Sequence, residues 1–462
     1  MRTIGGHDME LEVFVTPGLG DNSYLLASGG EAALIDPQRD VERMLRAAAA
    51  RGADVRLVLE THIHNDYVSG AAEVRAATGA EIAGPAEAGY AFAFTPLNEG
   101  RELHVGGIKL VAVETPGHTP EHTAYAAFAE GSEAPAAVFT GGSLIVGSAG
   151  RTDLLGPDLT DRLTRDQYRS LRHLLSFPDD TEVLPTHGAG SFCATVAPHQ
   201  DRTSTIGRER ASNPTLAEVD EDAFVREQLS GLLAYPRYYA HMAPINRAGP
   251  RVFGQVPLPR ALVPDEAAAL LGDGAWMIDG RGGADFAAAH VPGSLNVPLD
   301  DSFGSYVGWL VPFGDPVVLV PPEPEDESVA EAAAQLFRIG YERFEGYVAG
   351  GIGSWRGSGR DVRSYPVATV DDVVAAARSG ADRVLDVRQR TEWEAGHLPG
   401  STHVFVADLP GRVDELPRDR EMLGACSSGH RAAIAASILD RAGVPVRLVA
   451  RSGVPKALRM LG

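Results

Sequence analysis

Cysteine and lysine are both scarce in this 462-residue chain, which holds two of each: Cys193 and Cys426, and Lys109 and Lys456. Two cysteines that lie far apart predict free thiols in a reducing compartment, not a disulfide framework. No apolar run approaches the ~20 residues that a membrane span needs. Residues 1–8 also lack the apolar core of a signal peptide. We therefore expect a cytoplasmic protein with no membrane partner.

Positive charge is in short supply as well, because 41 lysines and arginines face 62 acidic residues and leave a net charge of −21. Such a balance argues against nucleic acid or an anionic membrane as a partner. A small anionic substrate is still compatible with it, since a small molecule responds to the local field. The length predicts two to four domains.

One short segment near the start concentrates metal-ligating side chains. His62, His64 and Asp66 follow the apolar run 55–59, which we expect to be a buried strand, and a helical pattern begins near residue 71. His-x-His-x-Asp after a strand is metal-ligand spacing. Imidazole and carboxylate are the ligands that zinc and iron prefer. The alternative is a polar loop with two solvated histidines.

Three more predicted strands are each followed by a polar loop that could contribute to the same site. His118 follows the strand 110–114, Gly142 follows the strand 138–140, and His187 follows the strand 182–185. Further histidine-bearing loops after strands favour one shared site over scattered surface histidines.

This pattern resembles the metallo-β-lactamase fold over residues 8 to 245. The resemblance implies an α/β fold, an αββα sandwich with its site at one edge. The positions that match the family's ligands are His62, His64, Asp66, His118 and His187. Two positions depart from the family pattern: Tyr67 stands where a histidine is expected, and Gly142 stands where the metal-bridging aspartate is expected.

These departures limit the site to one ion. A binuclear site needs about eight ligand positions. Three histidines, His62, His64 and His118, suffice for one ion with a bound water, whereas Asp66 and His187 alone would hold a second ion weakly. We therefore expect one metal ion at most, and a metal-free domain stays an alternative.

Three segments resemble the persulfide dioxygenase branch of this fold in the form that is fused to rhodanese domains. They are the runs 150–153, 187–193 and 242–250. That branch implies one iron(II) held by two histidines and an aspartate, which favours Fe(II) over Zn(II) here. His62 and His118 match two of those ligands. The resemblance also suggests that Arg151 meets an anionic thiol carrier and that Cys193 holds sulfur near the metal.

A repeat fills the rest of the chain. Asp279 and His290 in the first copy, like Asp386 and His397 in the second, are eleven residues apart, and the copies are offset by 107 residues. Each copy is therefore a domain of about 100 residues, and alternating strands and helices predict a parallel sheet. The D-x-R and H-x-P-G-S runs in both copies resemble the rhodanese family.

The copies differ where chemistry would occur. In the second, a strand ends at Cys426 and a helix begins after Arg431. The loop is Cys426, Ser427, Ser428, Gly429, His430 and Arg431, with Cys426 and Arg431 as catalytic candidates and the others as substrate-binding candidates. A ring of backbone N–H groups at a helix N-terminus favours an anionic sulfur. The first copy has prolines and acids there, residues 319–328, and no thiol, so it is expected to be inactive.

The sequence thus predicts three domains: residues 1–250, metallo-β-lactamase-like; 258–360, an inactive rhodanese-like domain; and 366–462, a rhodanese domain carrying Cys426. The expected function is that of a persulfide dioxygenase-like and sulfurtransferase fusion acting on low-molecular-weight persulfides. The alternatives are a zinc-dependent thioester hydrolase of glyoxalase II type and a metal-free scaffold with sulfurtransferase activity only. Homo-oligomerisation stays open.

Overall fold

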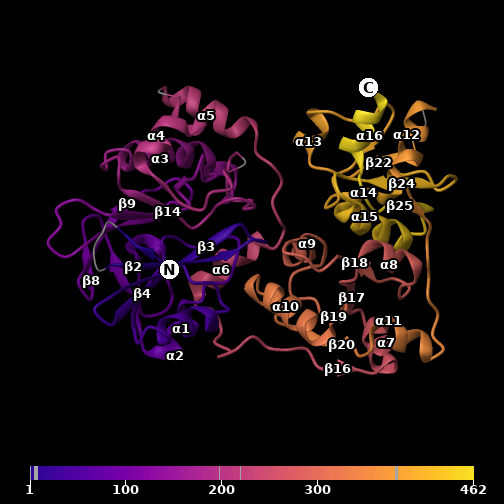
Figure 1. Cartoon of the computed structure of the whole chain (residues 1–462), viewed down its shortest axis with the longest axis horizontal. Coiled ribbons are helices and arrows are strands. Elements are labelled where there is room, and N and C mark those ends of the chain that lie inside the picture. Colours follow the sequence, from indigo (N-terminus) through magenta and orange to yellow (C-terminus); the bar gives the residue numbers. More distant parts are fainter. Residues whose placement is uncertain (1, 5–8, 197, 219, 380–382) are drawn as a thin grey trace. The chain divides into compact units, whose positions relative to one another are not determined.

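The computed structural model describes residues 2–4, 9–196, 198–218, 220–379 and 383–462 (Figure 1). Met1 and residues 5–8 of the N-terminal segment lie outside the described residues. The chain forms two compact units, Met1–Val256 with Phe337–Gly340 and Pro257–Leu336 with Tyr341–Gly462. Among the described residues, no helix combines the length and apolar character that crossing a membrane requires.

The first unit contains two large sheets. The seven-stranded sheet runs in chain order: β1 (Arg2–Thr3), β2 (Glu10–Thr16), β3 (Asp21–Ser28), β4 (Glu31–Ile35), β5 (Asp54–Leu59), β6 (Glu81–Pro85) and β7 (Thr95–Leu97). The six-stranded sheet has the order β15 (Ser204–Thr205), β14 (Glu182–Pro185), β11 (Ala137–Gly141), β10 (Thr123–Phe128), β9 (Ile108–Glu114) and β8 (Glu102–Val105). A small hairpin pairs β12 (Leu144–Ile145) with β13 (Ser148–Ala149).

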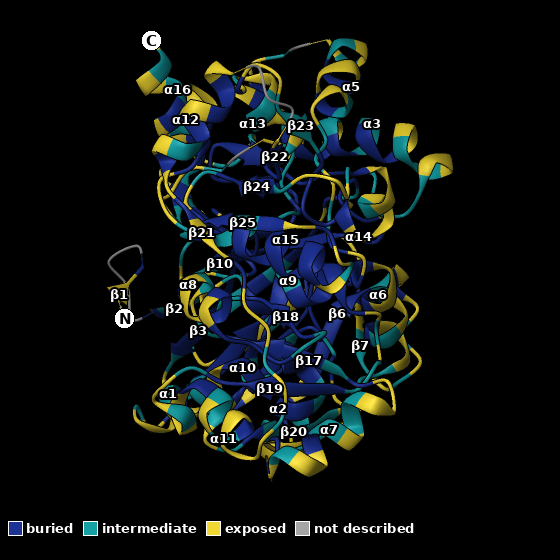
Figure 2. Ribbon diagram, turned by 90° about the vertical axis from the view of Figure 1, so that its right-hand side faces the viewer, coloured by how far each residue is buried: buried dark blue, intermediate teal, exposed yellow. Residues whose placement is uncertain are grey.

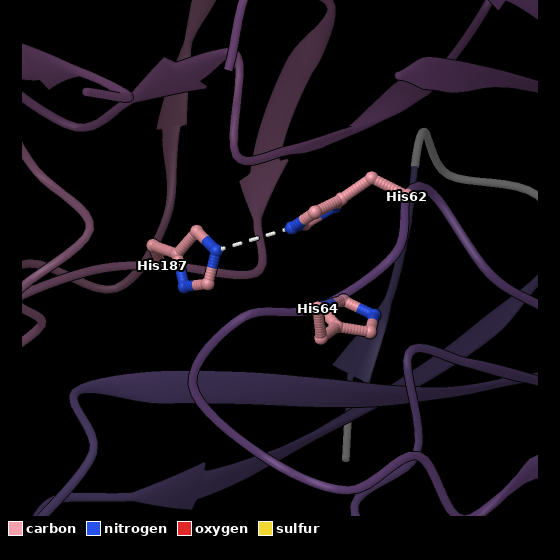
Figure 3. A group of neighbouring side chains, drawn as sticks. All are labelled: His62, His64 and His187. Atoms are coloured by element: carbon pink, nitrogen blue, oxygen red, sulfur yellow. Dashed lines mark hydrogen bonds between the residues drawn. The ribbon is translucent and has the colours of Figure 1, made fainter. Parts of the chain in front are cut away.

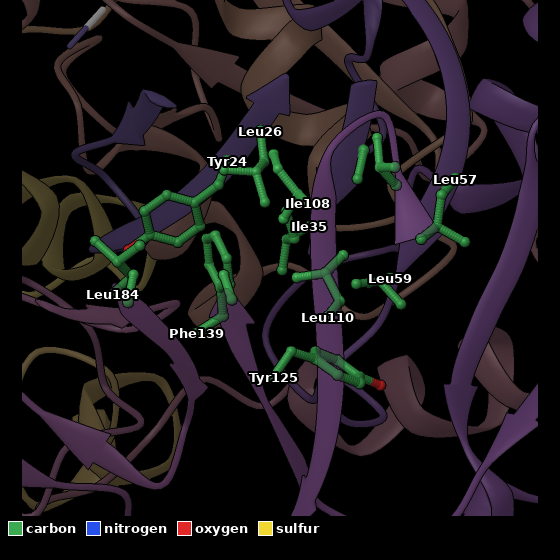
Figure 4. Close-up of a cluster of buried hydrophobic side chains, with 14 of the residues drawn as sticks. Tyr24, Leu26, Ile35, Leu57, Leu59, Ile108, Leu110, Tyr125, Phe139 and Leu184 are labelled. Carbon is green, nitrogen blue, oxygen red and sulfur yellow. The ribbon is translucent and has the colours of Figure 1, made fainter. Parts of the chain in front are cut away.

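The two sheets share one apolar core because alternate residues of their strands point to the same side. Tyr24, Leu26 and Ile35 from the first sheet belong to one cluster with Leu110 and Phe139 from the second (Figure 4). The opposite faces carry helices. The first sheet is covered by α1 (Glu42–Ala49) and α2 (Ala71–Thr78), and the second by α3 (Pro157–Leu174). The layers are therefore helix, sheet, sheet, helix, which confirms the predicted αββα sandwich.

Short helices complete the unit: η1 (Ala86–Ala88), α4 (Ile206–Ser212), η2 (Pro214–Leu216), α5 (Glu221–Ser230) and α6 (Tyr239–Ala248). The helix predicted over residues 166–175 in fact begins nine residues earlier, at Pro157. Proline is favoured at a first helical position, because its missing N–H would have no partner there. The first turns of α3 are rich in polar residues, so the apolar pattern of the sequence did not reveal where the helix begins.

The second unit contains two five-stranded sheets of the same design. The first copy has the order β16 (Ala261–Leu262), β20 (Phe344–Val348), β19 (Val317–Val320), β17 (Trp276–Asp279) and β18 (Leu295–Asn296). The second copy has the order β21 (Val367–Ala368), β25 (Val446–Val449), β24 (Met422–Ala425), β22 (Val384–Asp386) and β23 (Thr402–His403). Both sheets are parallel throughout, as predicted.

Helices alternate with these strands along the chain. The first copy contains α7 (Pro264–Gly272), α8 (Gly283–Ala288), α9 (Phe303–Leu310), α10 (Glu325–Arg338) and α11 (Gly351–Gly357). The second contains α12 (Val370–Arg378), α13 (Arg390–Glu394), α14 (Leu409–Arg412), η3 (Val413–Glu415), α15 (His430–Arg441) and α16 (Val454–Leu461). Helix α15 is almost entirely buried, since nine of its residues, Ala432–Asp440, are inaccessible (Figure 2).

Candidate functional site: a histidine cluster and a cysteine loop

Four strand ends of the first unit deliver the histidine cluster. β5 ends at Leu59, just before His62 and His64, and β9 ends at Glu114, before His118. β11 ends at Gly141 and pairs in parallel with β14, which leads to His187. All four histidines are at most 1 % exposed. Parallel strands bring their carboxyl ends to the same edge of a sheet, so residues far apart in sequence meet there.

His187 is the meeting point of the cluster. Its Nε2 atom lies 3.4 Å from Nε2 of His62 (Figure 3). Ligand atoms of His62, His64 and His187 lie within 4.8 Å of one another, and so do those of His118, His187 and Cys193. Burial and the neighbouring imidazoles hold the pKa values of His62 and His118 well below the usual value. Both rings are therefore neutral, the form in which imidazole binds a metal.

His64 is held from its far side by two carboxylates. Its Nε2 lies 3.2 Å from Asp36 and 3.1 Å from Glu60. Burial alone would lower the pKa of His64, but these two carboxylates outweigh it and raise that pKa well above its usual value. A carboxylate on the outer nitrogen of a ligating histidine fixes the ring and increases its basicity. The inner nitrogen, Nδ1, is buried and has no hydrogen-bond partner among the described residues.

Asp36 is the anchor of this arrangement, and the sequence interpretation missed it. Its carboxylate accepts hydrogen bonds from the backbone N–H and the hydroxyl of Thr61, both at 2.7 Å, and from the hydroxyl of Thr186. Its φ of 47° is uncommon for a residue with a side chain. Backbone strain of this kind persists where the surroundings determine it, often at functional sites. The one sequence signal was its place at the end of β4, before Pro37.

His122 and Asp21 were also missed. His122 accepts a hydrogen bond at Nε2 from the backbone N–H of Gly142, at 2.9 Å. Asp21 lies 2.8 Å from Nδ1 of His187. Ligand atoms of Asp21, Asp66 and His187 again lie within 4.8 Å of one another. Burial raises the pKa of Asp21 to about 8, and burial with the nearby Asp21 charge raises that of Asp66 to about 7.

Several buried donor atoms suit a metal ion. Nε2 of His118 and both carboxylate oxygens of Asp66 are buried without a hydrogen-bond partner among the described residues, as is Nδ1 of His64. Buried polar atoms normally have partners, so these atoms suit a cation. Nδ1 of His118 is already fixed on the backbone oxygen of Arg151, at 2.7 Å, which leaves Nε2 for the ion. The His/Asp cluster therefore suggests a metal ion.

The two departures from the family pattern have structural counterparts. Tyr67 stacks on His64 with ring centroids 4.3 Å apart, and its hydroxyl lies 3.0 Å from Nε2 of His64. At Gly142 a Cβ atom would lie 2.3 Å from Cδ2 of His118. A bridging aspartate therefore has no room there while His118 keeps its place. Both observations favour one ion over two.

Gly142→Ala should displace His118, because a Cβ atom at 2.3 Å cannot be accommodated without movement. We expect a loss of about 1–3 kcal/mol in the free energy of unfolding, as for other overpacked sites, together with lower metal content. Denaturant unfolding and elemental analysis measure the two effects. The matched control is Gly231→Ala, where a Cβ atom meets nothing within 4 Å. Wild-type stability and metal content in Gly142→Ala would contradict the packing argument.

Arg151 and Cys193, predicted to contact substrate, are both engaged inside the protein. The guanidinium of Arg151 is 2 % exposed and binds Asp153 at 2.6 and 2.7 Å, and it also lies 4.7 Å from the ring centroid of Tyr235. The Cys193 thiol is buried 3.9 Å from the hydroxyl of Tyr239, and burial raises the pKa of the thiol well above its usual value. Cys193 does lie beside His118 and His187.

The Cys426 loop follows β24 directly and ends where α15 begins. The backbone N–H of Gly429 points at Sγ of Cys426, at 3.1 Å. Gly429 has a φ of 109°, and a Cβ atom there would lie 2.1 Å from the Ala450 oxygen, so only glycine fits. The loop therefore directs the Gly429 N–H to the sulfur at the positive end of a twelve-residue helix.

Arg431 and Ser427 are tied to one carboxylate. Glu392, on α13, accepts hydrogen bonds from both terminal nitrogens of Arg431, the second at 2.9 Å, and from the Ser427 hydroxyl at 2.8 Å. Burial alone would raise the pKa of Glu392, but the Arg431 and Ser427 hydrogen bonds lower it to about 2. Ser428 is exposed at the tip. The loop thus offers backbone N–H groups and the Ser428 hydroxyl to a substrate. Glu392 neutralises the charge of Arg431.

The first copy lacks this apparatus at matching positions. Asp279 pairs with Val320 as Asp386 pairs with Ala425, so Pro321 stands where Cys426 stands. Helix α10 begins at Glu325, as α15 begins at His430, and its first turn is acidic. Proline has no N–H to offer, and acids repel anions. The first copy therefore has neither the thiol nor the donors for sulfur chemistry.

Comparison with known proteins agrees with this architecture. The model of the metallo-beta-lactamase superfamily matches residues 16–187, and that of the rhodanese-like domain matches residues 263–358 and 369–452. A hydroxyacylglutathione hydrolase of Cereibacter sphaeroides is 34% identical over 201 residues, 41% of this chain and 73% of that protein. One of Fuscovulum blasticum is 32% identical over 247 residues, 49% of this chain and 91% of that protein.

A solved structure extends the likeness beyond the first unit. The metallo-beta-lactamase from Staphylococcus aureus subsp. aureus COL superposes with a TM-score of 0.66 at 28% identity, covering 74% of this chain and 98% of that chain. The chain belongs to the metallo-beta-lactamase superfamily. It carries two rhodanese-like domains after that domain, and this combination of domains implies an enzyme.

Proposed function

We propose that this chain is a sulfur-handling enzyme that acts on low-molecular-weight persulfides in a reducing cytoplasm. Its C-terminal domain would transfer sulfane sulfur through Cys426, and its N-terminal domain would oxidise a persulfide to sulfite. The observation that carries the proposal is the Cys426 loop, whose sulfur accepts an N–H at the start of α15. The histidine cluster of the first unit supports the proposed persulfide oxidation.

Sulfur transfer needs no cofactor. The Cys426 sulfur attacks the outer sulfur of a persulfide R–S–SH, the R–S to sulfur bond breaks, and R–SH leaves with the proton while Cys426 becomes Cys–S–SH. Sulfite then attacks the outer sulfur, thiosulfate forms, and the electron pair returns to Cys426. The backbone N–H groups at the start of α15 stabilise the anionic sulfur in both steps.

The N-terminal reaction consumes O₂ and water: R–SSH + O₂ + H₂O gives R–SH, sulfite and two protons. His62, His64 and His118 would hold the ion together with His187, whose ligand atoms are grouped with those of His62 and His64 and with that of His118. Bound iron(II) would supply binding positions for O₂ and a sulfur ligand. The chain's own residues orient that site. Asp36 and Glu60 fix the His64 ring, and the Arg151 backbone oxygen fixes His118. The absence of a carboxylate at position 142 supports one ion.

A second candidate is hydrolysis of a glutathione thioester with zinc-activated water. The names of the relatives, hydroxyacylglutathione hydrolases, favour it. Glycine at position 142 weighs against it, because the family's bridging aspartate orients the attacking water. A third candidate is a metal-free first unit, with chemistry at Cys426 only.

The metal content of protein purified anaerobically without an affinity tag separates the three candidates. About one iron per chain, with oxygen uptake on adding glutathione persulfide, supports the persulfide oxidation. About one zinc, with hydrolysis of S-lactoylglutathione and no oxygen uptake, supports the hydrolase. No metal, with sulfur transfer from thiosulfate or persulfide, leaves Cys426 as the one active centre. Absence of sulfur transfer under every condition would reject the proposal.

A further inference from the structure

A carboxylate of the inactive first copy reaches the Cys426 loop of the second. Oδ2 of Asp300, in the segment after β18, lies 2.8 Å from Nδ1 of His430. Tyr306, on α9 of the same copy, has its ring centroid 5.1 Å from that of His430. Both contacts are within the second unit. Two residues of a domain without a thiol therefore border the residue that opens α15.

The contact fixes how the His430 ring carries its protons. A carboxylate accepts, so Nδ1 of His430 donates to Asp300. Nε2 of His430 is buried, and no described residue offers it a hydrogen bond. The side chains of His430 and Asp300 are 18 % and 52 % exposed, so the pair borders solvent although Nε2 itself is covered. This is the arrangement of an oriented general base, with one nitrogen held and the other unengaged.

The other charged groups around the loop are occupied. Arg431 and Ser427 are committed to Glu392. Burial raises the pKa of Tyr306 to about 12, with the charges of Cys426 and Glu392 adding to this effect and that of Arg431 opposing it, so Tyr306 keeps its proton. Of these side chains, His430 is the one suited to accept a proton.

The fold does not require a carboxylate at position 300. Asn296 pairs with Asp279 as His403 pairs with Asp386, so the position that matches Asp300 in the second copy is Ala407. The second copy forms the same sheet without an acid there. Burial alone would raise the pKa of Asp300, but the hydrogen bonds that it accepts from His430 and Ser302 lower it. Asp300 is therefore ionised and matched to His430.

We propose that Asp300 is a positioning residue that orients His430 as the proton acceptor for thiol acceptors of sulfane sulfur. This inference rests on the proposed sulfur transfer at Cys426. It gives the thiol-free copy a part in the chemistry of its partner domain. It also adds a substrate class, since a neutral thiol R–SH must lose a proton before it attacks, whereas sulfite carries its attacking electron pair already.

The proposed step balances without any further reactant. Nε2 of His430 takes the proton of R–SH, and the thiol sulfur attacks the outer sulfur of Cys426–S–SH. A new R–S–S bond forms, the Cys426 to sulfur bond breaks, and its electron pair remains on Cys426. The products are R–S–SH, the Cys426 thiolate and protonated His430, and the two electrons that the thiol sulfur loses are those that the Cys426 sulfur gains.

The test is single-turnover transfer from the full-length protein, loaded with sulfane sulfur, to glutathione and separately to sulfite at neutral pH. Asp300→Asn should lower the ratio of the glutathione rate to the sulfite rate by about 10–100-fold, the lower part of the range for general base catalysis. His430→Gln should lower the same ratio by a similar factor. The double variant should be no worse than His430→Gln, because the two residues act as one unit.

Asp301→Asn is the matched control, since its carboxylate is exposed and next in the chain, and it should leave the ratio unchanged. An unchanged ratio in both Asp300→Asn and His430→Gln would overturn the inference, as would an equal loss with both acceptors, which indicates a structural role only. Wild-type protein that transfers sulfur to neither acceptor would instead reject the proposed function, and the inference with it. Circular dichroism and unchanged metal content establish that each variant is folded.

Discussion

Cys426→Ser should abolish sulfur transfer, with a fall of at least ~10³-fold in the single-turnover rate, as expected when a nucleophile is removed. Serine is close in size to cysteine, and the site is buried, so the loop should keep its shape. A hydroxyl neither ionises near neutral pH nor forms a persulfide. The loading of the protein with labelled sulfane sulfur measures the loss directly.

The metal content of Cys426→Ser serves as its internal control and should equal that of the wild type, because Cys426 lies in the second unit and the histidine cluster in the first. Oxygen uptake with a persulfide should continue as well. Retention of sulfur loading in this variant would show that another group accepts sulfur, and the assignment of the loop would then fail.

His62→Ala should remove the metal ion, because the ring is one of the proposed histidine ligands and its Nε2 lies 3.4 Å from Nε2 of His187. We expect metal content to fall from about one ion per chain to a small fraction, since even outer residues of such sites change affinity by about 10–100-fold. The midpoint of thermal unfolding should then no longer rise when the metal is added, because a ligand stabilises only a fold that binds it.

The matched control is His104→Ala, which removes an exposed histidine on β8 of the same unit. Its metal content should stay at the wild-type level. Sulfur loading at Cys426 should be normal in both variants. Unchanged metal content in His62→Ala would mean that the ion, if bound, uses another group of donors, such as Asp21, Asp66 and His187.

Much of the site could be predicted from the sequence because its residues follow strands. Short apolar runs located β5, β9, β11 and β14, and the residues after them are expected to meet at one edge of a sheet. The repeat of Asp279 and His290 in Asp386 and His397 likewise predicted two similar parallel sheets. In both cases a local pattern determines where the next residues lie.

The residues that were missed act through contacts that no local pattern reveals. Asp36 holds Thr61 and His64 from 25 and 28 residues away, and it holds Thr186 from 150 residues away. Asp300 and His430 lie in different copies of the repeat. Arg151 is a related case, since the family resemblance suggested contact with an anionic carrier, and the structure shows that its guanidinium binds Asp153, two residues on. The hydrogen-bond and ion-pair partners of a side chain decide its role, and the three-dimensional fold is needed to identify them.

The near-complete burial of the four clustered histidines bears on how a metal ion enters and leaves. An ion cannot be exchanged through a wall of packed side chains at the rate of diffusion, so exchange must wait for local opening of the chain. Loading of the folded protein is then slow, and loading is faster during synthesis and folding, when the four strand ends have not yet closed. The identity of the bound metal would therefore depend on which metal ions were available in the cell while the chain folded, even after their concentrations have changed.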